Sequence, residues 1–105
     1  MYNDEGVIHY TAKDIQNLNL DDFTIVDIRD ETEFLTEAFE NAINIPLSNG
    51  FDGYDNVPKD KPVLVYCRIG ALSEEVAEIL NERGYEAATL DGGYFAYRAL
   101  LKSDK

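Results

Sequence analysis

The chain's only cysteine lies in a stretch that could support nucleophilic chemistry. In "VYCRIGALS", Cys67 directly follows an apolar run and precedes Ser73 by six positions. Gly70 permits a left-handed backbone, and so short a loop must turn several amides inward. Inward N–H groups and the positive end of a following helix form a concave anion site. A cysteine sulfur there is stabilised as the nucleophilic thiolate, and Arg68 adds to this if its side chain folds back.

A structural role is the competing interpretation of this cysteine. A cysteine after a buried strand is commonly an inert, small hydrophobic residue. The glycine, the short connection to a helix and the position after a strand favour the nucleophile. A Cys-His catalytic pair would require His9, the single histidine, to come close, and no loop sequence supports that. His9 cannot form a metal site alone, so we interpret it as structural and expect no metal or cofactor.

Short apolar runs alternate with helix-like segments, which is typical of an α/β domain with a mainly parallel sheet. Cys67 would then lie at the carboxyl end of a central strand, at the sheet edge where such folds bind ligands. The predicted strands are residues 7–10, 23–28, 42–45, 62–66 and 87–90. The predicted helices start after a capping box at Thr11, cover 31–38, start at an N-cap Ser73 and end before Gly84, and cover 94–101.

Length and composition favour one soluble domain over residues 1–105. No apolar run approaches the roughly 20 residues of a spanning helix, and the first ten residues lack the features of a secretory signal. One cysteine excludes an intramolecular disulfide, which fits a cytoplasmic location. Twenty-one acidic residues against nine basic ones give a net charge of −12, which disfavours nucleic-acid and membrane partners.

Four segments, in order, resemble the single-domain rhodaneses, which are sulfurtransferases that carry sulfane sulfur as a cysteine persulfide. The segments are "IVDIRDETEF", "NAINIPLS", "VYCRIGALS" and "LDGGYFAYRAL". The resemblance implies a three-layer α/β/α sandwich. Its sheet would be doubly wound, with five parallel strands and the first strand at one edge.

The resemblance also implies a site and a reaction. Cys67 would carry the persulfide, moving sulfur from thiosulfate or another persulfide donor to a thiol or cyanide. The expected partners are a small sulfur-containing anion or thiol, and a sulfur-donor or sulfur-acceptor protein. Substrate would be bound by the loop residues Arg68, Ile69, Gly70, Ala71, Leu72 and Ser73.

Leu72 departs from the resemblance, because many rhodaneses have an arginine there that helps to bind the anionic donor. This favours an alternative function, a sulfur-relay or binding module with weak activity on small donors. A phosphatase is a third possibility, since the dual-specificity phosphatases related to this fold also use a cysteine loop. They require a longer loop with arginine six positions after the cysteine, where this chain has Ser73.

An acidic-arginine-glutamate pattern follows the second predicted strand, at Asp27, Arg29 and Glu33. Arg29 and Glu33 are four positions apart and could pair at the start of a helix. We interpret the three residues as a structural ion-pair network and leave them out of the catalytic set.

Overall fold

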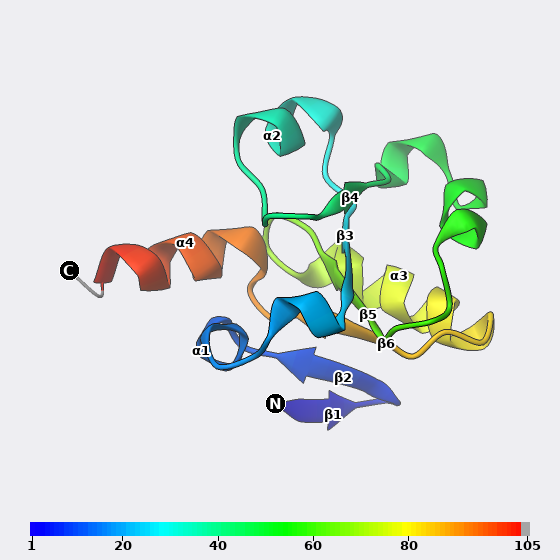
Figure 1. The fold of residues 1–105 in the computed structure, drawn as a ribbon, viewed down its shortest axis with the longest axis horizontal. Helices are drawn as coiled ribbons and strands as arrows, with labels where there is room; N and C mark the ends of the chain where they lie inside the picture. Colours follow the sequence, from blue (N-terminus) through cyan, green and yellow to red (C-terminus); the bar gives the residue numbers. More distant parts are fainter. Residues whose placement is uncertain (104–105) are drawn as a thin grey trace.

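The computed structural model describes residues 1–103, which form one mixed sheet with helices on both sides (Figure 1). The strand order is β1-β2-β6-β5-β3-β4. All neighbours pair in parallel except β1 and β2. The strands are β1 (Tyr2–Asp4), β2 (Val7–Tyr10), β3 (Thr24–Asp27), β4 (Ile43–Asn44), β5 (Val63–Tyr66) and β6 (Ala87–Leu90).

The expected doubly wound parallel sheet is confirmed, and β1 adds a sixth, antiparallel strand. The edge position expected for Val7–Tyr10 therefore belongs to β1. Glu5 and Gly6 connect the two strands with φ angles of 51° and 87°. Positive φ at both residues of a two-residue loop suits the twist of a β-hairpin. All three β1 residues are exposed, so this strand has no alternation of apolar and polar residues to reveal it.

Helices cover both faces of the sheet. In Figure 1, α3 lies behind the sheet, and α1 and α4 pack against each other on the opposite side. The capping box predicted at the first helix is confirmed, because Thr11 and Asp14 each accept a hydrogen bond from the other's backbone N–H. The helices are α1 (Ala12–Gln16), α2 (Glu31–Thr36), α3 (Ala71–Glu82) and α4 (Gly93–Ser103). Single 3-10 turns occur at Leu20–Asp22, Leu47–Asn49 and Asp52–Asn56.

The central strand β5 shows why the apolar runs are continuous. Val63 and Val65 point to the face covered by α3, and Leu64 and Tyr66 point to the face covered by α1 and α4. All four are fully buried. A strand covered on both faces needs apolar residues at every position. Burying each such side chain stabilises the fold by about 1.5–3 kcal/mol. Packing on both faces therefore fixes the position of the end of β5, and Cys67 is the next residue.

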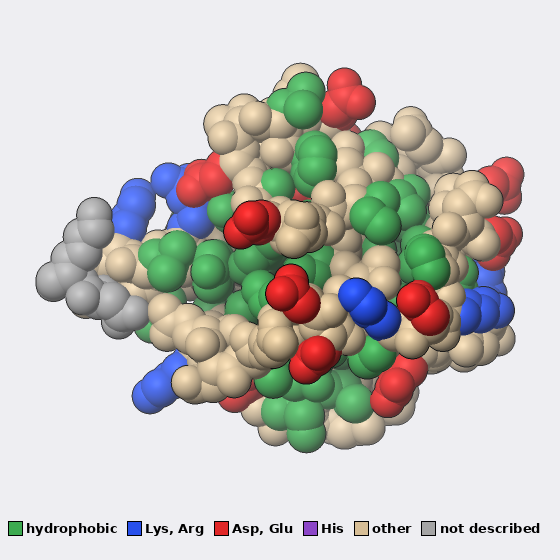
Figure 2. Space-filling view, viewed as in Figure 1, with side chains coloured by type: hydrophobic (Ala, Val, Ile, Leu, Met, Phe, Trp, Pro, Cys, Tyr) green, Lys and Arg blue, Asp and Glu red, His purple; other side chains and the backbone are tan. Residues whose placement is uncertain are grey.

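The surface agrees with the acidic composition. Figure 2 shows acidic side chains spread over one face among hydrophobic ones, with basic side chains standing apart from one another. Within residues 1–103, no helix has the length and apolar character needed to cross a membrane.

Candidate active site

A pocket of about 520 Å³ opens where β3 and β5 end. Its position is that of ligand sites in open α/β sheets, outside the carboxyl ends of the strands. The lining comes from the segments that follow both strands, helix α2, the turn after β4 and the first residues of α3. The lining residues are Ile28, Arg29, Asp30, Glu33, Leu47, Ser48, Cys67, Arg68, Ile69, Ala71 and Leu72.

Cys67 lies in the wall of this pocket with 5% of its surface exposed. Its Sγ accepts a hydrogen bond from the Gly70 backbone N–H at 3.1 Å, and lies 3.5 Å from Ser73 Oγ. The Gly70 amide thus turns inward toward the sulfur, and among the described residues it is the one amide hydrogen bond found there where the short loop predicted several.

Helix α3 begins at Ala71, so the prediction that Ser73 is its N-cap is wrong. Gly70 precedes the helix in the left-handed region, with φ of 102°. Ser73 is completely buried in the first turn, and its hydroxyl lies 2.7 Å from Thr89 Oγ1 and donates to Gly70 O. The hydroxyl is hydrogen-bonded to Thr89 of β6, and this partner could not be identified from the residues around Ser73. Ser73 therefore contacts the sulfur from within the first turn of α3 and does not cap the helix.

The cysteine loop is also held by the first residues of α4. The carbonyls of Cys67 and Arg68 accept hydrogen bonds from the N–H groups of Tyr94 and Phe95, at 2.9 and 3.0 Å. A Cβ on Gly93 would overlap the Arg68 carbonyl. The backbone of the loop is therefore positioned by direct contact with this glycine.

Replacing Gly93 by alanine should lower the free energy of unfolding by roughly 1–3 kcal/mol, because φ is positive there and the new methyl group displaces the cysteine loop. Denaturant unfolding would measure the loss. Gly50→Ala is the matched control, since Gly50 has φ of 86° but open space around the added Cβ. Equal losses in the two variants would show that the contact between Gly93 and the cysteine loop does not contribute to the free energy of unfolding.

Arg68 does not contribute a free cation to the pocket. Its guanidinium is exposed and donates to both carboxylate oxygens of Glu33, at 2.6 and 3.0 Å. This hydrogen-bonded pair holds the pKa of Glu33 below its ordinary value. Arg68 was expected to stabilise a thiolate only if its side chain folds back, and its guanidinium pairs with Glu33 instead.

Arg29 belongs to a buried structural network. Its guanidinium pairs with both carboxylate oxygens of Asp27 and donates to the Glu37 carbonyl. It also lies 4.7 Å from the centre of the Tyr94 ring. The predicted network is therefore present with different partners, because Arg29 binds Asp27 and Glu33 binds Arg68.

Five of the seven predicted site residues line the pocket: Cys67, Arg68, Ile69, Ala71 and Leu72. Gly70 and Ser73 do not line the pocket, but both contact the Cys67 sulfur. The residues that the prediction missed follow β3 and β4. Their signal was available, because residues after parallel strands gather at the same sheet edge. They are Ile28, Arg29, Asp30, Glu33, Leu47 and Ser48.

Fold and site together define an α/β domain that presents a single cysteine in a short loop before a helix. The sequence matches the rhodanese-like domain family over residues 10–100, and the chain belongs to this family.

Relatives in this family are named as sulfurtransferases. The chain is 35% identical over 79 residues to thiosulfate sulfurtransferase GlpE of Coxiella burnetii, covering 74% of each protein. It is 34% identical over 84 residues to the tRNA sulfurtransferase of Desulfurococcus amylolyticus, covering 80% of this chain and 17% of that protein. The crystal structure of a rhodanese-related protein from Thermoplasma volcanium superposes with a TM-score of 0.82 at 26% identity, covering 89% of this chain and 92% of that one. The chain is thus a member of a rhodanese sulfurtransferase family.

Proposed function

We propose that this protein transfers sulfane sulfur through a persulfide on Cys67. The Cys67 thiolate attacks the outer sulfur of thiosulfate, a new S–S bond forms, and sulfite leaves with the electron pair of the broken S–S bond. Cyanide or an acceptor thiolate then attacks the terminal sulfur. The bond to Cys67 breaks, the cysteine thiolate is restored, and thiocyanate or an acceptor persulfide is released.

The position of the cysteine carries this proposal. Its sulfur lies in the pocket wall with the Gly70 amide 3.1 Å away, at the start of α3. The amide and the positive helix end favour anionic sulfur, both as the thiolate and as the persulfide. The 520 Å³ pocket leaves room for a donor. The free thiol would work in a reducing compartment such as the cytoplasm.

The protein should gain the mass of one sulfur atom when it is incubated with thiosulfate and then measured under non-reducing conditions. Because Cys67 is the only cysteine, one added sulfur identifies its position without ambiguity. Added cyanide should return the original mass. An unchanged mass with thiosulfate and with a persulfide donor would contradict a sulfur-carrying role.

The rim of the pocket favours a second function within the same chemistry, a sulfur relay between proteins. Ile69 and Leu72 line the pocket with 64% and 52% of their surfaces exposed. An apolar rim gives no charge contact to thiosulfate, and exposed apolar side chains beside a site suit a protein partner. In this form of the proposal, Cys67 receives sulfur from a donor protein and reacts weakly with small donors.

A further inference from the structure

His9 is a buried histidine without a hydrogen-bonding partner in the part of the chain that the structure describes. It is 4% exposed, and neither Nδ1 nor Nε2 makes a hydrogen bond. Buried polar groups are nearly always satisfied, and leaving one unpaired costs about 1–3 kcal/mol. Tyr2 stacks on the ring with centroids 4.6 Å apart, so the imidazole is also covered. The ring therefore has two buried nitrogens that no described protein group satisfies.

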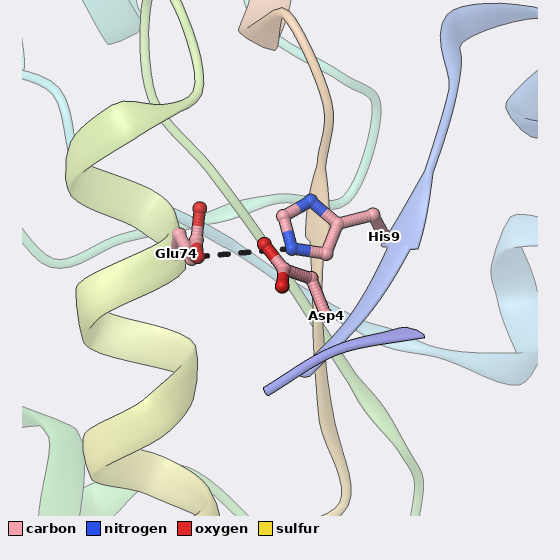
Figure 3. A group of neighbouring side chains, drawn as sticks. All are labelled: Asp4, His9 and Glu74. Atoms are coloured by element: carbon pink, nitrogen blue, oxygen red, sulfur yellow. Dashed lines mark ion pairs between the residues drawn. The ribbon is translucent and has the colours of Figure 1, made fainter. Parts of the chain in front are cut away.

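Carboxylates from two other elements surround this ring. Figure 3 shows Asp4 from β1 and Glu74 from α3 converging on the imidazole of His9. One ligand atom from each of the three residues lies within 4.8 Å of the others. His9 Nε2 is 3.9 Å from Glu74 Oε1, and Nδ1 is 3.8 Å from Asp91 Oδ1 on the opposite side. The two nitrogens therefore face different carboxylates.

We propose that Asp4, His9 and Glu74 bind a divalent transition-metal ion, with Zn²⁺ as the best match. Zinc takes imidazole nitrogen and carboxylate oxygen at about 2.0–2.2 Å, which places neighbouring ligand atoms about 3.3–3.6 Å apart in a tetrahedron. The separation of 3.9 Å between His9 and Glu74 needs little adjustment to reach this. Water would complete the coordination.

Asp91 lies 3.8 Å from Nδ1, the ring nitrogen that faces away from Glu74. Metal-bound histidines usually present their other ring nitrogen to a carboxylate, which fixes the tautomer and orients the ring. Here Asp91 faces Nδ1 while Asp4 and Glu74 share the other side of the site. At 3.8 and 3.9 Å, neither carboxylate makes a direct hydrogen bond to the ring, so both nitrogens are open to a ligand.

The proposed metal site is separate from the cysteine pocket but shares its helix. None of its ligands lines the pocket, yet Glu74 follows Ser73, which contacts the Cys67 sulfur. A bound ion would join the β1–β2 hairpin to the first turn of α3. It would therefore tie the N-terminal edge of the sheet to the helix that positions the cysteine loop.

Zinc binding should be measured by calorimetry on the full chain carrying Cys67→Ser, which removes the thiol as a competing ligand. We expect one Zn²⁺ per chain and an unfolding temperature that rises with zinc concentration. The ring resonances of the single histidine should shift on saturation, and they need no assignment because the chain has only one. Glu74→Gln and Asp4→Asn should each weaken binding at least about tenfold.

Glu75→Gln is the matched control, because it removes the same charge from the next, exposed position of α3. It should leave zinc affinity unchanged. Equal weakening by Glu75→Gln and Glu74→Gln would identify non-specific attraction to an acidic surface and overturn the proposal. Unmoved histidine resonances at saturating zinc would overturn it too. Loss of sulfur transfer with zinc binding intact would contradict only the proposed function, so the two hypotheses fail independently.

Discussion

Replacing Cys67 by serine should reduce sulfur transfer from thiosulfate to cyanide to the uncatalysed background. A hydroxyl cannot hold sulfane sulfur as a persulfide, and the chain has no second thiol to take over. Steady-state formation of thiocyanate would measure the loss.

The same substitution should leave the fold intact. A serine Oγ can accept the Gly70 N–H in place of Sγ, so the loop keeps its hydrogen bond. We expect the free energy of unfolding to change by about 1 kcal/mol or less. Transfer that persists in a folded Cys67→Ser variant would require a carrier other than a thiol, and the proposed mechanism would then be wrong.

Replacing Leu72 by arginine should improve the use of thiosulfate by about one to two orders of magnitude. Leu72 lines the pocket on the first turn of α3 and is half exposed, so a longer cation can reach a bound anion from there. A charge-assisted hydrogen bond contributes roughly 1.5–3 kcal/mol, which corresponds to this range. The gain should appear in kcat/KM for thiosulfate and shrink as the salt concentration rises.

Two comparisons make this test specific. Leu101→Arg adds the same charge at an exposed position of α4 outside the pocket, and should have little effect. An uncharged persulfide donor should be used equally well by Leu72→Arg and the unchanged protein. Equal gains with both donors, or no gain with thiosulfate, would show that position 72 does not select by charge. The argument for a protein relay would then lose its support.

Most of the fold could be predicted because apolar runs and capping signals are local. The ranges expected for β2 and β6 are the observed ones, and the capping box at Thr11 forms as predicted. Strand β1 and the role of Tyr54 could not be predicted in this way. Tyr54 lies in the 3-10 turn Asp52–Asn56, yet it is fully buried and its hydroxyl donates to the Ile45 carbonyl. Its burial depends on elements far away in the sequence.

The candidate site was likewise predictable where its signals are local in the sequence, and unpredictable where they depend on tertiary contacts. Cys67 and its loop were identifiable because a glycine and a helix follow one strand within a few positions. The function of Ser73 depends on Thr89, and the partners of Arg68 and Arg29 were set by which strand ends meet. Burial adds effects that sequence does not display. It raises the pKa of Tyr54 to about 12, so this phenol stays a hydrogen-bond donor near pH 10, where an exposed tyrosine is about half ionised.

During synthesis, Cys67 leaves the ribosome before the residues that complete its surroundings. Tyr94, whose N–H holds the Cys67 carbonyl, follows 27 positions later. At about 5–20 residues per second, the cysteine waits about one to five seconds for this partner. A nascent chain that ends before Gly92 has the thiol without the contacts that fix its loop. The geometry around the sulfur is therefore complete only after α4 has docked against the cysteine loop.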